Sequence, residues 1–429
     1  MTDSNTNAYL NNTFILKPLK HNLTMKKIKI PLLPRIIIAI VLGITFGQFF
    51  PEWAVRIFAT FNSIFSNFLT FLIPLIIVGL VTPAIADIGK SAGKLLLVTV
   101  IIAYGDSVLS GLFSYFTSSS IFPSLISSAD SVAHIDAIQN VEPFFTINIP
   151  AILDVMSALI LAFVMGLGIA YLGMKTLKDV ANEFEKIIAK TIAVVIIPLL
   201  PLYIFGIFLM MSNNGQAYQI MMAFISIIGI IFAMHVVLLI VQYCIAGVFT
   251  KRNPLKLLWK MLPAYFTALG TSSSAATIPV TLSSCKKNGV SSGIAGFVVP
   301  LCATIHLSGS AMKITACAVA LMLMQGMPFD LGMFTGFILM LGIMMVAAPG
   351  VPGGAIMAAL GVLQSILGFN QEQQALMIAL YIAMDSFGTA CNVTGDGAIA
   401  LIVDKFFRNK TASPSEEEAL EGLTDTQNL

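Results

Sequence analysis

Between Ile314 and Val403 the sequence contains no lysine or arginine. A stretch of this length without basic side chains must lie largely in lipid or in the interior of a protein. Acidic and amide side chains nevertheless interrupt it at Asp385, Asn392 and Asp396. Ionisable groups in a membrane span are costly, about 2.5–3.5 kcal/mol each on insertion scales, and therefore mark candidate functional sites. A carboxylate and a carboxamide one turn apart suggest a site for a cation, a substrate ammonium group, or both.

The composition of the whole chain supports a membrane protein. Hydrophobic residues make up 57% of the 429 residues, charged residues only 10%, and the mean hydropathy is +0.91. A soluble domain of this size would need more charge to cover its surface. The net charge of +2 gives no indication of a nucleic-acid partner. The five cysteines are scattered without disulfide or metal spacing, and the basic N-terminus lacks the pattern of a secretory signal peptide.

Eight apolar runs are long enough to cross a membrane. We expect them at residues 33–50, 56–84, 95–118, 150–174, 187–212, 217–249, 292–325 and 372–404, the last two being more broken. Lysines and arginines precede the first run and follow the second, fourth, sixth and eighth, whereas the intervening loops carry none. By the positive-inside rule, this distribution predicts that both termini are cytoplasmic.

Two further apolar segments do not fit a simple crossing. Segment 254–287 has basic residues at both ends and a polar, small middle at Gly270–Thr277, so it should enter and leave on the cytoplasmic side. Segment 328–370 has no basic flanks and is broken by Pro349–Gly354, so it should start and end outside. Broken backbone at membrane depth is tolerated only where protein covers it or it lines a cavity. We therefore predict two opposed re-entrant helical hairpins.

The sequence of hairpin, span, hairpin and span in the second half indicates an inverted repeat, with a solute site at its interface. We expect a basic cytoplasmic N-terminus over 1–32 and a transmembrane transporter domain over 33–405. Within that domain, 33–253 would form mainly scaffold spans and 254–405 a hairpin-rich transport core. Residues 406–429 are polar and acidic, and we expect a disordered cytoplasmic tail.

Three motifs resemble signatures of the dicarboxylate/amino acid:cation symporter family, which includes the bacterial and neuronal glutamate transporters. They are Thr271–Val280, Pro349–Gly354 and Asn392-Val393-Thr394-Gly395-Asp396. The resemblance extends over about 33–405 and is strongest over 263–405. It implies an all-α membrane protein of glutamate-transporter-like fold and a secondary active symporter in the plasma (inner) membrane. It also implies a homotrimer whose transport domains move like an elevator.

The resemblance also implies which positions hold the solute and the cations. Substrate-binding positions would be Ser272, Ser273, Ser274, Ser310, Val351, Pro352, Gly353, Asp385, Thr389 and Asn392. Cation-binding positions would be Cys302, Thr304, His306, Asn392 and Asp396, with sodium as the only metal. Sodium ions or protons are expected as co-transported ions, and no other cofactor is expected.

One departure from the family pattern concerns the solute. Gly388 stands where glutamate and aspartate carriers place an arginine for the second carboxylate. Without that bidentate partner, a dicarboxylate would leave one charge poorly compensated. We therefore expect inward cation flow to drive uptake of a small neutral amino acid such as serine, threonine or alanine. Glutamate, aspartate or a C4-dicarboxylate is the alternative.

A second departure concerns the cations. The seventh span reads His306-Leu307-Ser308-Gly309-Ser310 where the family has Asn-Met-Asp-Gly-Thr, and Lys313 follows one turn later. Asp106 is an unusual carboxylate in the third span. We hypothesise that Lys313, paired with Asp106 and also with His306, replaces one bound sodium, which predicts reduced sodium stoichiometry or partial proton coupling. A structural ion pair without a transport role is an equally good explanation of Asp106 and Lys313.

Other classes of function fit the sequence less well. An anion channel would need a continuous polar stripe, whereas the polar groups cluster at one depth. An intramembrane enzyme could use serines 272–274 with His306, but neither a Gly-x-Ser-x-Gly elbow nor a zinc pattern is present. No ATP-binding motif occurs, so uphill transport would depend on ion gradients. His235 in the sixth span is expected to be a packed polar residue, and Asp154 to lie at a span end.

Overall fold

The computed structural model describes residues 32–88, 94–126, 141–213, 217–348 and 352–411, and the regular elements in these segments are all helical. The first half contains α1 (Leu32–Gly47), α2 (Glu52–Ile88), α3 (Lys94–Ile126), α4 (Val155–Leu172), α5 (Lys175–Thr191), the π-helical turn η1 (Ile192–Ile196), α6 (Ile197–Asn213) and α7 (Ala217–Thr250). The second half contains α8 (Pro254–Trp259), α9 (Leu262–Thr271), α10 (Ser274–Lys287), α11 (Ser292–Ile305), α12 (Ser308–Met324), α13 (Leu331–Ala347), α14 (Gly354–Leu367), α15 (Gln371–Ala383) and α16 (Asp385–Thr411). The predictions for residues 1–31, for Val351 and for residues 412–429 lie outside the described part.

The helices confirm a multi-pass membrane protein. Within the described segments, six helices are long and apolar enough to cross a bilayer: Glu52–Ala86, Lys94–Leu125, Val155–Leu172, Lys175–Asn213, Ile225–Thr250 and Ser292–Met324. The pair α15 and α16 makes a seventh if it is one span bent by 64° at Met384. Helix α1, predicted as the first crossing, is a shorter apolar helix of 16 residues. The finer count of eight crossings therefore stays a prediction.

The region around the fifth predicted span differs from the prediction. The fourth and fifth predicted spans, 150–174 and 187–212, are separated by a basic segment, but one continuous run of helix extends from Lys175 to Asn213. The sequence of α5 explains the difference, because its apolar residues recur at helical spacing and bury Ala181 and Ile188 while its charged residues remain on other faces. The charged segment thus continues the span as an amphipathic helix.

Both predicted breaks in the hairpin segments are present. Helix α9 ends at Thr271 and α10 begins at Ser274, while α13 ends at Ala347 and α14 begins at Gly354. In each segment the two helices pack against each other, as a helical hairpin requires. On which side of a bilayer each hairpin enters stays a prediction.

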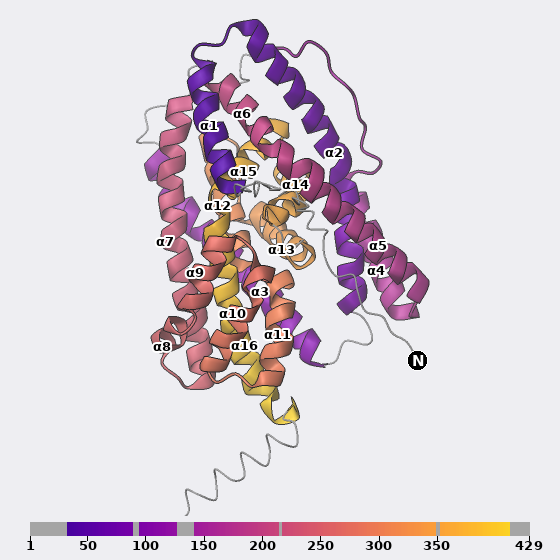
Figure 1. Ribbon diagram of the computed structural model, residues 1–429, viewed down its shortest axis with the longest axis vertical. Helices are drawn as coiled ribbons and strands as arrows, with labels where there is room; N and C mark the ends of the chain where they lie inside the picture. The colour runs from indigo at the N-terminus through magenta and orange to yellow at the C-terminus, as the bar shows by residue number, and fades with distance from the viewer. Residues whose placement is uncertain (1–31, 89–93, 127–140, 214–216, 349–351, 412–429) are drawn as a thin grey trace, which may run out of the picture. The chain divides into compact units, whose positions relative to one another are not determined.

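Helix α16 lies at the centre of the helices that carry the motifs. It packs against α7, α9, α10 and α11, and Figure 1 shows α9, α10 and α11 beside it. Helices α11 and α12 together form the span Ser292–Met324, and 94% of its apolar 18-residue stretch is buried inside the protein. The polar side chains of α12 therefore face other helices and not lipid.

Candidate solute and cation site

The first hairpin tip contains a serine in the left-handed backbone conformation. Ser272 has φ +50°, in the left-handed region, and it ends α9, while Ser273 caps α10 by accepting a hydrogen bond from the Ala276 N–H at 3.3 Å. The Ser272 hydroxyl lies 2.7 Å from the hydroxyl of Ser386. The first tip therefore contacts the first turn of α16. Ser274 is buried at the start of α10.

The second hairpin tip contacts Asp385, which precedes Ser386 in the first turn of α16. Gly353 caps α14 with φ +75°, a conformation that a side chain would strain. Its backbone N–H donates a hydrogen bond to Oδ2 of Asp385 at 3.0 Å. Pro352, which precedes it, is partly buried. The two tips, far apart in the sequence, thus converge on Asp385 and Ser386 at the bend between α15 and α16.

Asn392 holds the break between α11 and α12. Its Oδ1 accepts hydrogen bonds from the N–H groups of Gly309 at 2.8 Å and Ser310 at 3.3 Å. These donors lie in the first turn of α12, where N–H groups have no acceptor within the helix. Its Nδ2 donates to the Ser310 hydroxyl at 3.2 Å, and that hydroxyl also lies 3.0 Å from the Tyr381 hydroxyl. Asn392 and Ser310 are both buried, and their hydrogen bonds join α16 to the first turn of α12.

Lys313 does not pair with Asp106, and this part of the hypothesis is wrong. Its Nζ lies 3.3 Å from Oδ1 of Asp385 and donates to the carbonyls of Met384 at 3.3 Å and Tyr381 at 3.4 Å. The ammonium also lies 3.5 Å from the centroid of the Tyr381 ring. The lysine side chain extends toward the bend between α15 and α16, and its residue is fully buried.

His306 bridges two carboxylates instead. Its Nε2 lies 2.7 Å from Oδ2 of Asp106, and its Nδ1 lies 2.8 Å from Oδ1 of Asp396. A neutral imidazole has only one N–H, so two hydrogen bonds to carboxylates require one further proton, on the ring or on a carboxyl group. The histidine and both carboxylates therefore form one cluster that joins α3, the α11–α12 break and α16.

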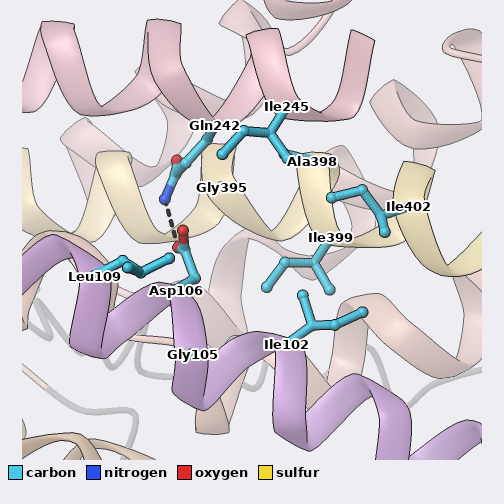
Figure 2. A pocket seen from close by; sticks show the side chains of 10 residues that line it. All are labelled: Ile102, Gly105, Asp106, Leu109, Gln242, Ile245, Gly395, Ala398, Ile399 and Ile402. Atoms are coloured by element: carbon cyan, nitrogen blue, oxygen red, sulfur yellow. Dashed lines mark hydrogen bonds between the residues drawn. The ribbon is translucent and has the colours of Figure 1, made fainter. Parts of the chain in front are cut away.

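Gln242 of α7 completes this cluster and was not identified from the sequence. Its Nε2 donates to Oδ2 of Asp106 at 2.6 Å and to the Ser308 hydroxyl at 3.0 Å. Figure 2 shows Gln242 and Asp106 pointing toward one another from α7 and α3. The available signal was an amide deep within the long apolar run 217–250, whose other glutamine, Gln219, lies near its start. Tyr381 and Ser386 were also missed, since a hydroxyl in an apolar helix is not informative without its partner.

A pocket of about 240 Å³ gives access to the cluster at Asp106. It is bounded by α3, α7 and α16, and its wall is mainly apolar, with Ile102, Leu109, Ile245, Ile399 and Ile402 around Asp106 and Gln242 (Figure 2). The Asp106 side chain is 18% exposed, whereas those of His306 and Asp396 are 0% and 2% exposed. Asp106 is therefore the most accessible member of the three.

The remaining cation positions provide few oxygen ligands for sodium. The Thr304 hydroxyl is exposed and donates to the Leu301 carbonyl at 2.8 Å, and Cys302 offers a soft thiol. The Asn392 oxygen accepts two backbone N–H groups, and one Asp396 oxygen contacts the His306 ring. The role of these five positions in binding a cation stays a prediction.

Three other polar residues have structural partners, and the substrate-binding role of Thr389 stays a prediction. The Thr389 hydroxyl donates to the Asp385 carbonyl at 2.9 Å, one turn earlier in α16. His235 is buried, with Nε2 3.3 Å from the Gly309 carbonyl, as expected of a packed polar residue. Asp154 caps α4 by accepting from the Ser157 N–H at 2.9 Å.

Comparison with known proteins supports the assignment of these motifs. The sequence matches the Sodium:dicarboxylate symporter family over residues 32–406. It is 29% identical to the serine/threonine transporter SstT of Acinetobacter baumannii (strain AYE), over 88% of this chain and 97% of the relative. SstT of Streptococcus suis (strain 05ZYH33) is also 29% identical, over 77% and 93%. The neutral amino acid transporter B(0) of Rattus norvegicus is 31% identical, over 42% and 33%.

The family match includes both hairpins, the α11–α12 break and the acidic helix α16 that together form the site. The family consists of transporters and not of enzymes, and its members couple solute movement to cations. The chain belongs to the sodium:dicarboxylate symporter family.

Proposed function

We propose that this symporter uses inward cation flow to import a small solute that carries a carboxylate group. The observation that supports the proposal is the convergence of both hairpin tips on Asp385 and Ser386. The tips bring the N-termini of α10 and α14, where the helix dipole favours an anion, to a buried acidic helix. Opening and closing of the second tip would break and restore the contact between Gly353 and Asp385, which couples access to the state of the site.

The first candidate solute is a small neutral amino acid such as serine, threonine or alanine. Gly388 offers no guanidinium for a second carboxylate, and the relatives named above carry names that specify serine, threonine or neutral amino acids. The serines of the first tip would bind the carboxylate, and Asp385 the ammonium group.

The second candidate is a solute without an ammonium group, such as a C4-dicarboxylate, or an acidic amino acid. It is favoured by one contact, because Lys313 provides a buried ammonium next to Asp385 that the sequence argument placed elsewhere. A cation in this position weakens the argument that a second carboxylate would remain uncompensated.

Sodium, protons or both would drive the transport, through Asp396 and the cluster of His306 and Asp106. His306 contacts Asp396, the carboxylate that the family resemblance assigns to sodium. The imidazole would therefore occupy one oxygen that a sodium ion would otherwise use. We therefore propose reduced sodium stoichiometry compared with carriers that have asparagine and aspartate in the seventh span.

The arrangement in the membrane follows from charge and from family membership. The basic segments before the first span and after α16 favour cytoplasmic termini in a plasma (inner) membrane. We also propose a homotrimer with elevator-like transport domains, a property implied by the family resemblance.

Uptake into proteoliposomes tests the proposal. Full-length protein should accumulate a labelled amino acid or dicarboxylate above its external concentration when an inward sodium or proton gradient is imposed. Dissipating the gradient with an ionophore should abolish accumulation. Saturable uptake without single-channel currents would separate a symporter from a channel. Equal accumulation with and without both gradients would contradict the proposal.

A further inference from the structure

Both oxygens of the Asp385 carboxylate already have partners within the protein. Oδ1 lies 3.3 Å from the ammonium of Lys313, and Oδ2 accepts the Gly353 N–H at 3.0 Å. The Asp385 side chain is 8% exposed and that of Lys313 is fully buried. A solute ammonium that used Asp385 as its counter-charge would therefore have to displace Lys313 or lie beside it.

The position of the Lys313 ammonium is supported by more than this carboxylate. The carbonyls of Tyr381 and Met384 belong to the C-terminal end of α15, where the helix dipole favours a positive charge. The face of the Tyr381 ring adds a cation–π contact at 3.5 Å. Three kinds of group thus hold the ammonium at the bend between α15 and α16.

Gly388 leaves the space through which the lysine reaches this position. A Cβ atom at residue 388 would lie 2.7 Å from Nζ and 2.9 Å from Cε of Lys313, too close for either atom to stay where it is. The position of the Lys313 ammonium therefore depends on the absence of a side chain at residue 388. The long basic side chain of Lys313 from α12 fills the space that Gly388 leaves beside α16.

We propose that Lys313 determines the solute class by occupying the ammonium position next to Asp385. The inference rests on the proposed function, in which this pocket binds the transported solute. With the carboxylate already compensated, a second ammonium would be desolvated beside a like charge and without a free counter-ion. The site then takes small carboxylates that lack a free ammonium group, such as hydroxy acids and dicarboxylates, and Lys313 provides a counter-charge for a carboxylate.

Solute pairs that differ only in an ammonium or a hydroxyl group test this directly. We would measure the affinities of purified full-length protein for L-malate and L-aspartate, and for L-lactate and L-alanine, by ligand-induced thermal stabilisation. The wild type should bind each hydroxy acid at least about tenfold more tightly than its amino acid partner. Lys313→Met should lower this ratio by about tenfold or more, because Asp385 becomes available to the ammonium.

Two further variants keep the comparison sound. Lys405→Met removes an exposed lysine of α16 and should leave the ratio unchanged. Lys313→Gln retains a donor for the α15 carbonyls if the methionine variant does not fold. Because the quantity is a ratio within one preparation, it is independent of the folded fraction, and the wild-type ratio is informative even if neither variant folds.

The outcomes separate the inference from the proposed function. A wild type that prefers the amino acid in both pairs, or an affinity ratio that Lys313→Met leaves unchanged, overturns the inference. Either result leaves the assignment of this pocket as the solute site intact. Binding of no member of either pair to the wild type or to Lys313→Met overturns the assignment of the pocket itself, and the inference with it.

Discussion

His306 places its Nδ1 atom 2.8 Å from Oδ1 of Asp396, so an imidazole contacts the carboxylate expected to bind sodium. The same ring contacts Asp106, and one side chain thus connects the two carboxylates. A cation bound at Asp396 would have to share this carboxylate with the ring. The sodium dependence of this carrier should therefore be controlled by a residue that is not itself an oxygen ligand.

We expect His306→Asn to increase the response to sodium. Removing the ring takes this partner from the buried carboxylate of Asp396 and leaves Asp106 with Gln242, which should cost about 3–5 kcal/mol of stability. Sodium at 100 times its dissociation constant would restore about 2.7 kcal/mol if it binds only the folded variant. Thermal unfolding in sodium and in choline chloride measures the difference.

His235→Asn is the matched control, because that buried histidine contacts the Gly309 carbonyl and no carboxylate. It should lose stability without gaining a sodium response. A sodium effect in His306→Asn no larger than in the wild type would contradict the assigned role of the ring.

Gly388→Ala should displace the Lys313 ammonium from Asp385. The added Cβ would lie 2.7 Å from Nζ, and relief of this overlap should cost about 1–3 kcal/mol of unfolding free energy. The variant should also bind amino acids relatively better than the wild type does, in the same direction as Lys313→Met. Thermal unfolding and the affinity ratio of L-malate to L-aspartate report the two effects.

The control is Gly296→Ala, since a Cβ at this exposed position of α11 meets no atom within 4 Å. Its stability should remain within about 0.5 kcal/mol of the wild type. If both alanine variants behaved alike, the space beside residue 388 would have no role in placing Lys313.

Asn392→Ala should loosen the break between α11 and α12. It leaves the N–H groups of Gly309 and Ser310 without their acceptor, at a cost of about 1–3 kcal/mol for each buried group. Solute affinity should fall as well, because Ser310 and Tyr381 lose their fixed positions. Asn213→Ala, which removes an exposed amide bonded to the Gly47 carbonyl, is the control for a simple loss of one hydrogen bond. A fully stable Asn392→Ala with normal solute affinity would contradict this role.

The helical fold was largely predictable from the sequence because its signals are local. Apolar runs and breaks at Gly270–Thr277 and Pro349–Gly354 predicted spans and hairpins, since proline, glycine and polar residues interrupt helices wherever they occur. The charged helix α5 was missed because its lysines resembled a cytoplasmic loop, while its burial depends on helical spacing.

The partners within the site could not be predicted in the same way. Lys313 lies 72 residues from Asp385 and 207 positions after Asp106 in the chain, and either carboxylate was a plausible partner. The choice depends on the bend at Met384 and on the space at Gly388, which only the packed structure defines. Gln242 illustrates the same limit, since its role depends on the approach of α7 to α3.

The central claim is that the transported solute binds where both hairpin tips meet Asp385. Gradient-driven uptake into proteoliposomes by Asp385→Asn tests it most directly, with Asp330→Asn, a change at the exposed cap of α13, as the control. We predict that Asp385→Asn accumulates none of the solutes that the wild type concentrates, because Lys313 loses its counter-charge and the second tip loses its charged acceptor. Accumulation by Asp385→Asn equal to that of the wild type and of Asp330→Asn would contradict the account.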